Sequence, residues 1–573
     1  MKKRSISWVI FTVCMIMSVY LCPVFAQTAE TVIEFSEDDL IFSSLDGYDV
    51  VEIDSDRSFL DGIEGEPFLP VVTANVLLPA GAEVVDVYTK VEQETEIEGK
   101  FLIMPTQKLV PVSANKKTDF VLPNSKVYKS ASRQRQNAVE AGARKIMRGH
   151  YLAPVRVHPV DYIPAEGKLI LRNKIRIYVE YTVDKQNIVN YRKEKKDNVF
   201  TRMLSDSVLN TSAMSSYDEQ LGRDFEIEES TDFVVMGAPT NVVQYLIITP
   251  AHMVDEFQPL ADWKTKKGVP AEIVSITTIN ANYTGPTLQY RIKSCIRDYA
   301  LNKGTIWVVL GADRDYIPEQ ACYSRVGEEV IYDIPADLYY SDIDVLNWDG
   351  NGNGIAGELD DGVDMGPDVF VGRISVKQEA EVTNVVNKIL AYEKNCPSGL
   401  ADSMLLGGAR LWGYIGGVSD AEAKSERMWN NYIKPPWWGS RYRFYDTNTD
   451  FPGGASYNVN PTNINARINA GCNLFHMICH GSETSWGVEG SSYTTSHVAS
   501  LYSPGVYTNI ATIACLSNAF DRFIGNCLGE AFLKQPNGGA VSYIGSSRYG
   551  WDYSGTAYPG PSLQYNQTFY NYL

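Results

Sequence analysis

Residues 473–481 read NLFHMICHG, an apolar run that ends in a histidine and a glycine. The run lies between two glycines, and its length is typical of a buried strand and short for a helix. In a strand, His476 and His480 lie on one face and Cys479 on the other, so Cys479 cannot act together with His480. The stretch therefore predicts a strand that presents His480 at its carboxyl end.

A second apolar run, YTNIATIAC at residues 507–515, ends in Cys515 before a polar turn. The separation between His480 and Cys515 leaves room for one crossover connection between two parallel strands. Neighbouring parallel strands would then hold an imidazole and a thiol at the same edge of a sheet. Such a pair can form a thiolate nucleophile, and nearby main-chain N–H groups can hold the developing oxyanion.

The two histidines also leave a metal site as an alternative. His476 and His480 are spaced as in a helical zinc-binding pair, which would predict a metallohydrolase. That site requires a helix, and the glutamate that it uses as a base is replaced by Met477. The strand interpretation is therefore favoured, and no catalytic metal is expected.

The fold class follows from how apolar runs alternate along the chain. Tyr245–Thr249 is a short apolar strand, a helical spacing follows it, and Thr305–Leu310 is apolar throughout, as in a strand buried on both faces. This alternation predicts an α/β fold with a largely parallel sheet flanked by helices, and functional loops at the carboxyl ends of its strands. Residues 27–190 show a period of two instead and predict a β-rich domain.

Further segments divide the chain. Residues 1–26 have the charged, apolar and small-residue zones of a secretory signal, which predicts a secreted or cell-surface protein with no later transmembrane segment; an uncleaved anchor is the alternative. Residues 191–240 are charged and lack periodicity, which predicts a linker that is cut between Arg192 and Arg223. The α/β unit is expected in two halves, residues 241–398 and 399–573.

Composition limits the possible partners and the pairing of cysteines. The 573 residues carry a formal net charge of −18, which argues against a nucleic-acid partner because phosphate binding needs a basic face. Two of the nine cysteines lie in the predicted signal. The odd number that remains leaves at least one thiol unpaired, even in an oxidising compartment.

One loop has the pattern of a calcium site. In DGNGNG, which begins at Asp349, side-chain oxygens alternate with glycines, as in a loop of the EF-hand type. The predicted calcium ligands are Asp349, Asn351, Asn353 and Asp360, and the ion would be structural. A solvated acidic turn is the alternative.

The region around both predicted strand ends carries a family resemblance. Residues 479–487 (CHGSETSWG), with TSHV at 495–498 and IACLSN at 513–518, closely resemble the gingipain family of secreted cysteine endopeptidases. The resemblance implies a caspase-like catalytic domain that acts on protein or peptide substrates. It also implies that the β-rich region from residue 27 is an inhibitory propeptide, so that the chain would be a zymogen.

The resemblance assigns roles to single residues. It implies that His480 is the catalytic histidine, Cys515 the nucleophile and the Gly481 N–H an oxyanion donor. Trp551 matches a tryptophan that lines the specificity pocket, and Glu422 lies near the acid that selects a basic P1 residue. A preference for a basic P1 residue is therefore predicted.

Two departures from the family pattern favour a different class of function. The loop after Leu405–Leu411, where the family places an acid that orients the histidine, has no acid before Asp420. The sequence also ends at Leu573, earlier than the family's catalytic domains, which predicts a C-terminally truncated fragment. The alternative function is a non-catalytic surface or binding protein that keeps the peptidase fold.

Overall fold

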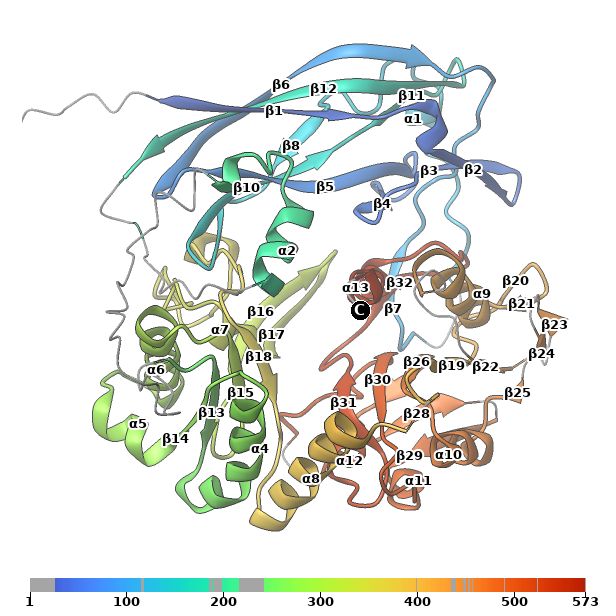
Figure 1. Ribbon diagram of the computed structural model, residues 1–573. Coiled ribbons are helices and arrows are strands. Elements are labelled where there is room, and N and C mark those ends of the chain that lie inside the picture. Colours follow the sequence, from blue (N-terminus) through green and yellow to red (C-terminus); the bar gives the residue numbers. More distant parts are fainter. Residues whose placement is uncertain are drawn as a thin grey trace, which may run out of the picture.

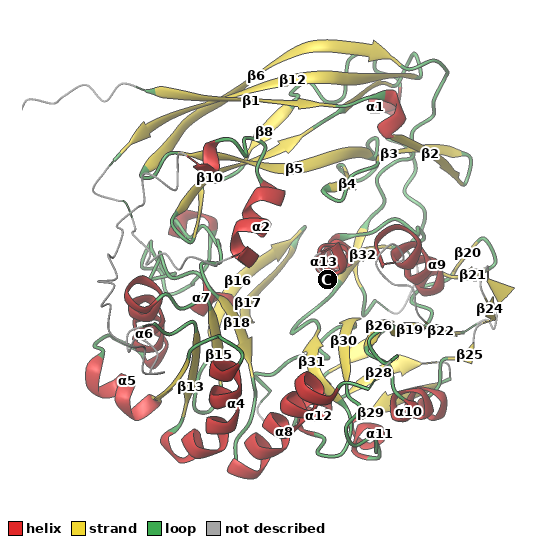
Figure 2. Cartoon of the chain, in the orientation of Figure 1, coloured by secondary structure: helices red, strands yellow, loops and turns green. Residues whose placement is uncertain are grey.

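The structure, a computed structural model, describes most of the chain after the predicted signal. The described residues are 26–114, 118–184, 188, 198–215, 242–397, 399–433, 440–446, 450–451, 454–455, 457–488, 490–522 and 524–571. Residues 1–25 and the predicted cleavage region from Arg192 to Arg223, apart from 198–215, lie outside them. In Figure 1 the N-terminal β-rich domain lies across two α/β halves, and Figure 2 shows strands in all three parts.

The N-terminal domain consists of two antiparallel sheets that enclose one core, as the period-two pattern predicts. One sheet joins β1 (Gln27–Glu34), β6 (Ala82–Glu96), β11 (Val160–Ile163) and β12 (Lys168–Val183). The other joins β4 (Ser58–Asp61), β5 (Leu69–Leu78), β8 (Val139–Ala141), β9 (Lys145–Met147) and β10 (His150–Val157). Shorter elements complete it: η1 (Glu37–Asp39), β2 (Leu40–Leu45), β3 (Tyr48–Ile53), β7 (Leu109–Pro111) and α1 (Ser125–Tyr128).

The N-terminal domain extends further than the sequence pattern predicted. Helix α2 (Asn198–Ser207) places Phe200 and Leu204 in the core of the β-rich domain, together with Val208. These apolar residues recur every four positions, which is the spacing of one helix face. The predicted boundary at residue 190 is therefore too early, because the charged residues around it mask an amphipathic helix.

The first α/β half is built on a parallel sheet of order β14-β13-β15-β18. Ile247 of the central strand packs with α4 and α8, whereas Leu246 and Ile248 pack with α5 and α6, so helices cover both faces. Its strands are β13 (Tyr245–Thr249), β14 (Ala271–Ser275), β15 (Trp307–Leu310), β18 (Phe370–Arg373) and the hairpin β16 (Gln320–Val326) and β17 (Glu329–Ala336). Its helices are η3 (Ala251–Met253), α4 (Val254–Lys266), α5 (Ile276–Asn282), α6 (Leu288–Lys303), α7 (Leu338–Ser341), η4 (Leu359–Asp361) and α8 (Glu379–Asn395).

The second half has a parallel sheet of order β25-β22-β19-β26-β30-β31, with β26 and β30 side by side. Its sheet strands are β19 (Ser403–Gly408), β22 (Ser440–Tyr445), β25 (Tyr457–Asn458), β26 (Leu474–Ile478), β30 (Thr508–Ile513) and β31 (Ala540–Ile544). Its helices are α9 (Asp420–Met428), η5 (Trp429–Ile433), α10 (Pro461–Ala470), α11 (Thr495–Ala499), α12 (Leu528–Lys534) and α13 (Pro561–Asn571). Outer strands are β20 (Tyr414–Ile415), β21 (Val418–Ser419), β23 (Asp450–Phe451), β24 (Gly454–Ala455), β27 (Gly481–Ser482), β28 (Ser485–Val488), β29 (Ser491–Thr494) and β32 (Trp551–Tyr553).

The predicted fold class is confirmed: a β-rich domain precedes an α/β unit with parallel sheets and flanking helices. Both strands that decided the prediction are present, and their carboxyl ends point to the same edge of one sheet. Within the described part of the chain, none of the helices combines the length and apolar character needed to cross a bilayer.

Candidate active site

The structure brings His480 and Cys515 to one edge of the second sheet. Ile478 of β26 is the register partner of Ile513 of β30, and each candidate residue is the second one beyond its strand partner. The two strand ends touch at Gly481, because a Cβ built there would lie 2.4 Å from the carbonyl oxygen of Cys515. Only glycine permits this approach, so the residue after the histidine is fixed by packing.

The His480 ring is oriented by a main-chain carbonyl. Its Nε2 lies 2.7 Å from the carbonyl oxygen of Leu411, and a carbonyl only accepts, so Nε2 carries the proton. The other nitrogen, Nδ1, is buried and makes no hydrogen bond with any described residue. With Nε2 bonded to this carbonyl, Nδ1 is the ring nitrogen that can act as a general base.

Asp420 acts on this carbonyl through the loop that carries it. The carboxylate is buried and accepts hydrogen bonds from the N–H groups of Leu411 at 2.9 Å, Trp412 at 2.8 Å and Gly413 at 3.1 Å. Three bonds to one charged group fix the loop in a single conformation. Asp420, the first acid after Leu405–Leu411, thus positions the Leu411 carbonyl, and this carbonyl contacts the histidine.

We expect Asp420→Asn to lower kcat for peptide hydrolysis by about 10- to 100-fold, the usual cost of disturbing an orienting group. The NH2 group of asparagine cannot accept hydrogen bonds from the loop N–H groups. The loop would therefore shift, and the Leu411 carbonyl would move relative to Nε2. KM should change by less than about twofold, because no contact to substrate is lost. Steady-state kinetics on the processed chain would show this, with Asp402→Asn on an exposed turn as control; an unchanged kcat would contradict the positioning role.

Cys515 lies in a strained turn at the end of β30. Leu516, the next residue, has φ of +62°, which is the left-handed region and costs a residue with a side chain about 1 kcal/mol. Its N–H donates to the carbonyl of Arg548 at 2.8 Å, which holds the turn in place. A polar turn after Cys515 was predicted, but the left-handed conformation at position 516 was not, because neither glycine nor asparagine occupies it.

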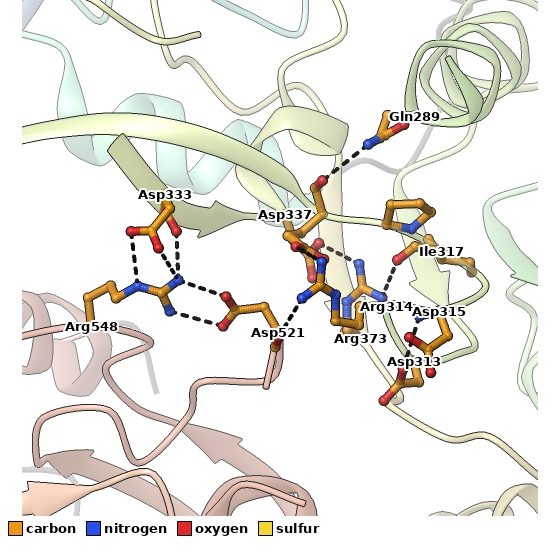
Figure 3. A network of polar contacts seen from close by, with 12 residues as sticks. Gln289, Asp313, Arg314, Asp315, Ile317, Asp333, Asp337, Arg373, Asp521 and Arg548 are labelled. Carbon is orange, nitrogen blue, oxygen red and sulfur yellow. Dashed lines mark hydrogen bonds and ion pairs between the residues drawn. The ribbon is translucent and has the colours of Figure 1, made fainter. Parts of the chain in front are cut away.

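A polar network anchors the same loops to the first α/β half (Figure 3). The guanidinium of Arg548 donates to both carboxylate oxygens of Asp521, at 2.9 and 2.7 Å, and to the carbonyl of Asp333 in β17 at 2.7 Å. Arg314 donates to the Asp521 carbonyl at 2.6 Å. These contacts between the two halves thus fix the loops that carry Asp521 and Arg548.

A segment of the N-terminal domain covers the thiol. Strand β7 pairs antiparallel with β32, the Val112 N–H donates to the Gly550 carbonyl at 2.7 Å, and Trp412 Nε1 donates to the Ala114 carbonyl at 2.9 Å. Burial raises the pKa of the Cys515 thiol above its ordinary value. The Gly550 N–H, 3.3 Å from Sγ, and the polar groups of Ser113 offset part of this increase. Residues 109–114, which we call the covering segment, therefore block access to Cys515.

Comparison with known proteins agrees with this division of the chain. A family model described as Peptidase family C25 matches residues 238–573, and one described as Propeptide_C25 matches residues 26–215. The chain belongs to peptidase family C25. The members of this family are cysteine endopeptidases, and the resemblance to gingipains is confirmed.

Similar proteins include gingipains of Porphyromonas gingivalis. Lys-gingipain W83 is 24% identical over 524 residues, which are 90% of this chain and 27% of that protein. Gingipain R2 is 22% identical over 538 residues, which are 91% of this chain and 64% of that protein. The complex of the RgpB pro- and mature domains of the same organism matches with a TM-score of 0.42 and 19% identity, over 57% of this chain and 73% of that one.

The two residues predicted for the specificity pocket of this C25 chain lie in different elements, Trp551 in a strand beside the covering segment and Glu422 in a helix. Trp551 begins β32 opposite Pro111 of the covering segment, and its N–H donates to Ser562 Oγ at 2.8 Å. Glu422 is fully buried in the first turn of α9, where its carboxylate accepts the Ser419 N–H at 3.0 Å. Its role as the acid that selects P1 stays a prediction.

The loop predicted to bind calcium is a turn in which side-chain oxygens accept main-chain N–H groups, and calcium binding by it stays a prediction. Asp349 Oδ2 accepts the Gly354 N–H at 3.0 Å, and its Oδ1 is buried without a hydrogen-bond partner among the described residues. Asp360 is exposed, and the carboxylate of Asp361 turns into the loop instead, where it accepts the Asn351 N–H at 3.2 Å. The 3₁₀ turn η4 causes this shift, because it rotates the acidic residues by one position.

The remaining predicted groups have structural partners. His476 is buried, its Nδ1 lies 2.9 Å from the Tyr570 hydroxyl, and burial lowers its pKa to about 3. The two histidines of the metal alternative therefore contact different partners, Tyr570 and Leu411. All seven cysteines of the described chain are unpaired, and only Cys396 is exposed.

The sequence did not identify several groups of the site. They are the Leu411 carbonyl, the Leu516 turn, the covering segment and the Gly550 main chain. Every residue type has the same main-chain groups, so the sequence does not reveal which of them make contacts in the site. The strand ends at His480 and Cys515, in contrast, could be found from apolar patterning.

Proposed function

We propose that this chain is the precursor of an endopeptidase that hydrolyses protein or peptide substrates through the Cys515 thiol, assisted by His480. The register of β26 and β30, with Gly481 in contact with Cys515, is the observation that supports this most. It holds an imidazole with an available Nδ1 and a thiol at the ends of neighbouring strands.

The groups support a sequence of proton and acyl transfers. His480 Nδ1 takes the proton from the Cys515 thiol, and the thiolate attacks the substrate carbonyl to give a tetrahedral intermediate. The Gly481 N–H is proposed to donate to the oxyanion. The imidazolium then protonates the leaving amine, and water, activated by the same imidazole, hydrolyses the thioester. The Leu411 carbonyl holds Nε2–H throughout.

The N-terminal domain is proposed to keep the precursor inactive. The covering segment occupies the space above the thiol, and a second anchor holds the domain in place. There the Ile146 N–H donates to Asp364 at 2.6 Å and the Arg148 N–H to Asp368 at 2.5 Å. Activation then requires cleavage of the linker and release of the propeptide. The signal-like N-terminus supports export to the cell surface or medium.

The substrate preference of the proposed enzyme is a separate matter. The sequence predicts a basic P1 residue, and one relative is named Lys-gingipain. That preference rests on Glu422, whose carboxylate is engaged with the Ser419 N–H in this structure. The residue that lies beside Cys515 in the covering segment supports a different preference.

Inhibitors of different classes test the proposed chemistry. The processed chain should hydrolyse casein, lose that activity with iodoacetamide and keep it with phenanthroline, with calcium present throughout. Inhibition by phenanthroline alone would support the metallohydrolase with His476 and His480. No hydrolysis of casein or of a peptide library would support the non-catalytic binding protein.

We also propose that the loop from Asp349 binds calcium as a structural ion. The buried, unpartnered Asp349 Oδ1 and the oxygens of Asn351, Asn353 and Asp361 around one turn support this. Calcium prefers such oxygen ligands, and it would hold the loop closed. Asp360 was the acid predicted from the sequence, and Asp361, which accepts the Asn351 N–H, takes its place in this proposal.

Calorimetric titration of calcium distinguishes the roles of Asp349 and Asp360 in the proposed site. We expect the wild type and Asp360→Ala to bind one ion with similar affinity. Asp349→Ala should lose that binding event, because it removes two oxygens from the loop, and its melting temperature should no longer rise with calcium. Equal losses in both variants would contradict the register seen in the structure, and no binding in the wild type would reject the site.

A further inference from the structure

The covering segment is bound as an added strand, which fixes where each of its residues lies. Trp551 is the register partner of Pro111, Asp552 of Val110 and Tyr553 of Leu109. Addition of an extended peptide to a strand edge is a common mode of peptide recognition, in which main-chain bonds give affinity and side-chain pockets give specificity. The segment thus shows which pocket each side chain of an extended peptide would enter.

Val112 packs in one buried cluster with Cys515, and both residues contact the main chain of Gly550. The Val112 N–H donates to the Gly550 carbonyl at 2.7 Å, and the N–H of the same Gly550 lies 3.3 Å from Cys515 Sγ. Ser113 is the next residue of the covering segment, and its polar groups lower the pKa of the thiol. In a substrate bound in this way, the residue at the place of Val112 would be P1 and that at the place of Ser113 would be P1′.

The side chain of Val112 is enclosed by apolar groups. It is fully buried in a cluster made by the helices, strands and loops around the thiol. The members of this cluster are Leu411, Ala421, Ile478, Ile513, Cys515 and Leu563, with Trp412 and Leu516 at its margin. A pocket of this composition binds a branched aliphatic side chain by excluding water from it.

Three acidic residues that could pair with a basic P1 side chain already have hydrogen-bond or ion-pair partners inside the protein. Asp420 accepts three loop N–H groups, Glu422 accepts the Ser419 N–H, and Asp552 pairs with the buried Lys424 at 3.1 Å. A lysine or arginine at P1 would have to displace one of these bonds or remain unpaired in an apolar environment. Either event disfavours a basic side chain.

We propose that the S1 pocket of this enzyme accepts a small branched aliphatic residue, valine above all, and that Val112 occupies it as a built-in P1 residue. The inference rests on the proposed peptidase function. It replaces the expected basic P1 residue with an apolar one. It also extends to P4–P2, where the covering segment supplies leucine, valine and proline.

Reporter amides built on the covering segment test this inference. The processed chain would be given acyl-Leu-Val-Pro-Xaa reporter amides with Xaa as valine, alanine, arginine or lysine. We expect kcat/KM for valine to exceed that for arginine and lysine by at least about 100-fold, because the pocket offers an unpaired cation no partner. An equal or higher kcat/KM for arginine or lysine would overturn the inference and leave the peptidase intact.

A variant of the pocket wall provides a second readout. Ala421→Val reduces the space beside Val112, so the ratio of kcat/KM for valine to that for alanine should fall by about tenfold. Ala499→Val, on the exposed face of α11, should leave the ratio unchanged. An unchanged ratio in Ala421→Val would overturn the assignment of the pocket. If no reporter amide and no casein is hydrolysed by the wild type, the proposed function fails and the inference with it.

Discussion

Replacing Cys515 by alanine is expected to lower kcat/KM for peptide hydrolysis by about 10⁴-fold or more in the processed chain, since loss of a nucleophile removes the covalent route entirely. The fold should persist, because the change removes one buried sulfur at the end of a strand and leaves Gly481 free to pack against the main chain. Initial rates with casein and a melting curve would measure both effects.

Cys396→Ala provides the matched control for this substitution. Cys396 is the one exposed cysteine of the described chain, so its thiol is open to the same reagents but lies away from the sheet edge. We expect it to retain full activity. Activity of Cys515→Ala at the wild-type rate would reject the proposed mechanism, and loss of activity in Cys396→Ala would point to another thiol.

Replacing Val112 by aspartate is expected to make the unprocessed chain at least about 100-fold more active. The new carboxylate would be unpaired in an apolar pocket beside the thiol, which disfavours the covering segment by about 3 kcal/mol or more. The segment would then leave the site for a large fraction of the time. The initial rate of reporter hydrolysis, measured on protein shown by mass spectrometry to be intact, gives the result.

Leu122→Asp controls for the charge itself. Leu122 lies in the same N-terminal domain and is 73% exposed, so the same substitution there should leave the precursor inactive. After processing, the wild type, Val112→Asp and Leu122→Asp should have equal activity, because the substituted residues are removed with the propeptide. If intact Val112→Asp is as inactive as the wild type, the covering segment does not block the site.

The parts of the site that could be predicted are those that depend on strand patterning. Apolar runs that end in His480 and Cys515 predicted two strand ends, and their parallel register brought both residues to one edge. The loop from Asp349 was singled out because oxygen-bearing residues alternate with glycines there, and calcium binding by it stays a prediction. The shift from Asp360 to Asp361 depends on a single 3₁₀ turn, which such spacing does not encode.

The parts that could not be predicted depend on contacts between segments far apart in the chain. The covering segment, LVPVSA at residues 109–114, belongs to no motif that predicts a role at the site, and only its pairing with β32 reveals one. Similarly, nothing in the side chain of Leu411 indicates that its carbonyl orients an imidazole. Helix α2 was missed because charged residues precede it, although its apolar spacing is regular.

The most direct test of the central claim is the rate at which iodoacetamide alkylates Cys515, followed by peptide mass spectrometry in intact and processed chains. We predict that Cys515 is protected in the intact precursor, reacts rapidly after processing, and reacts much more slowly after processing when His480 is replaced by alanine. Equal rates of alkylation in all three proteins would contradict the pairing of His480 with Cys515 and the covering of the thiol by residues 109–114.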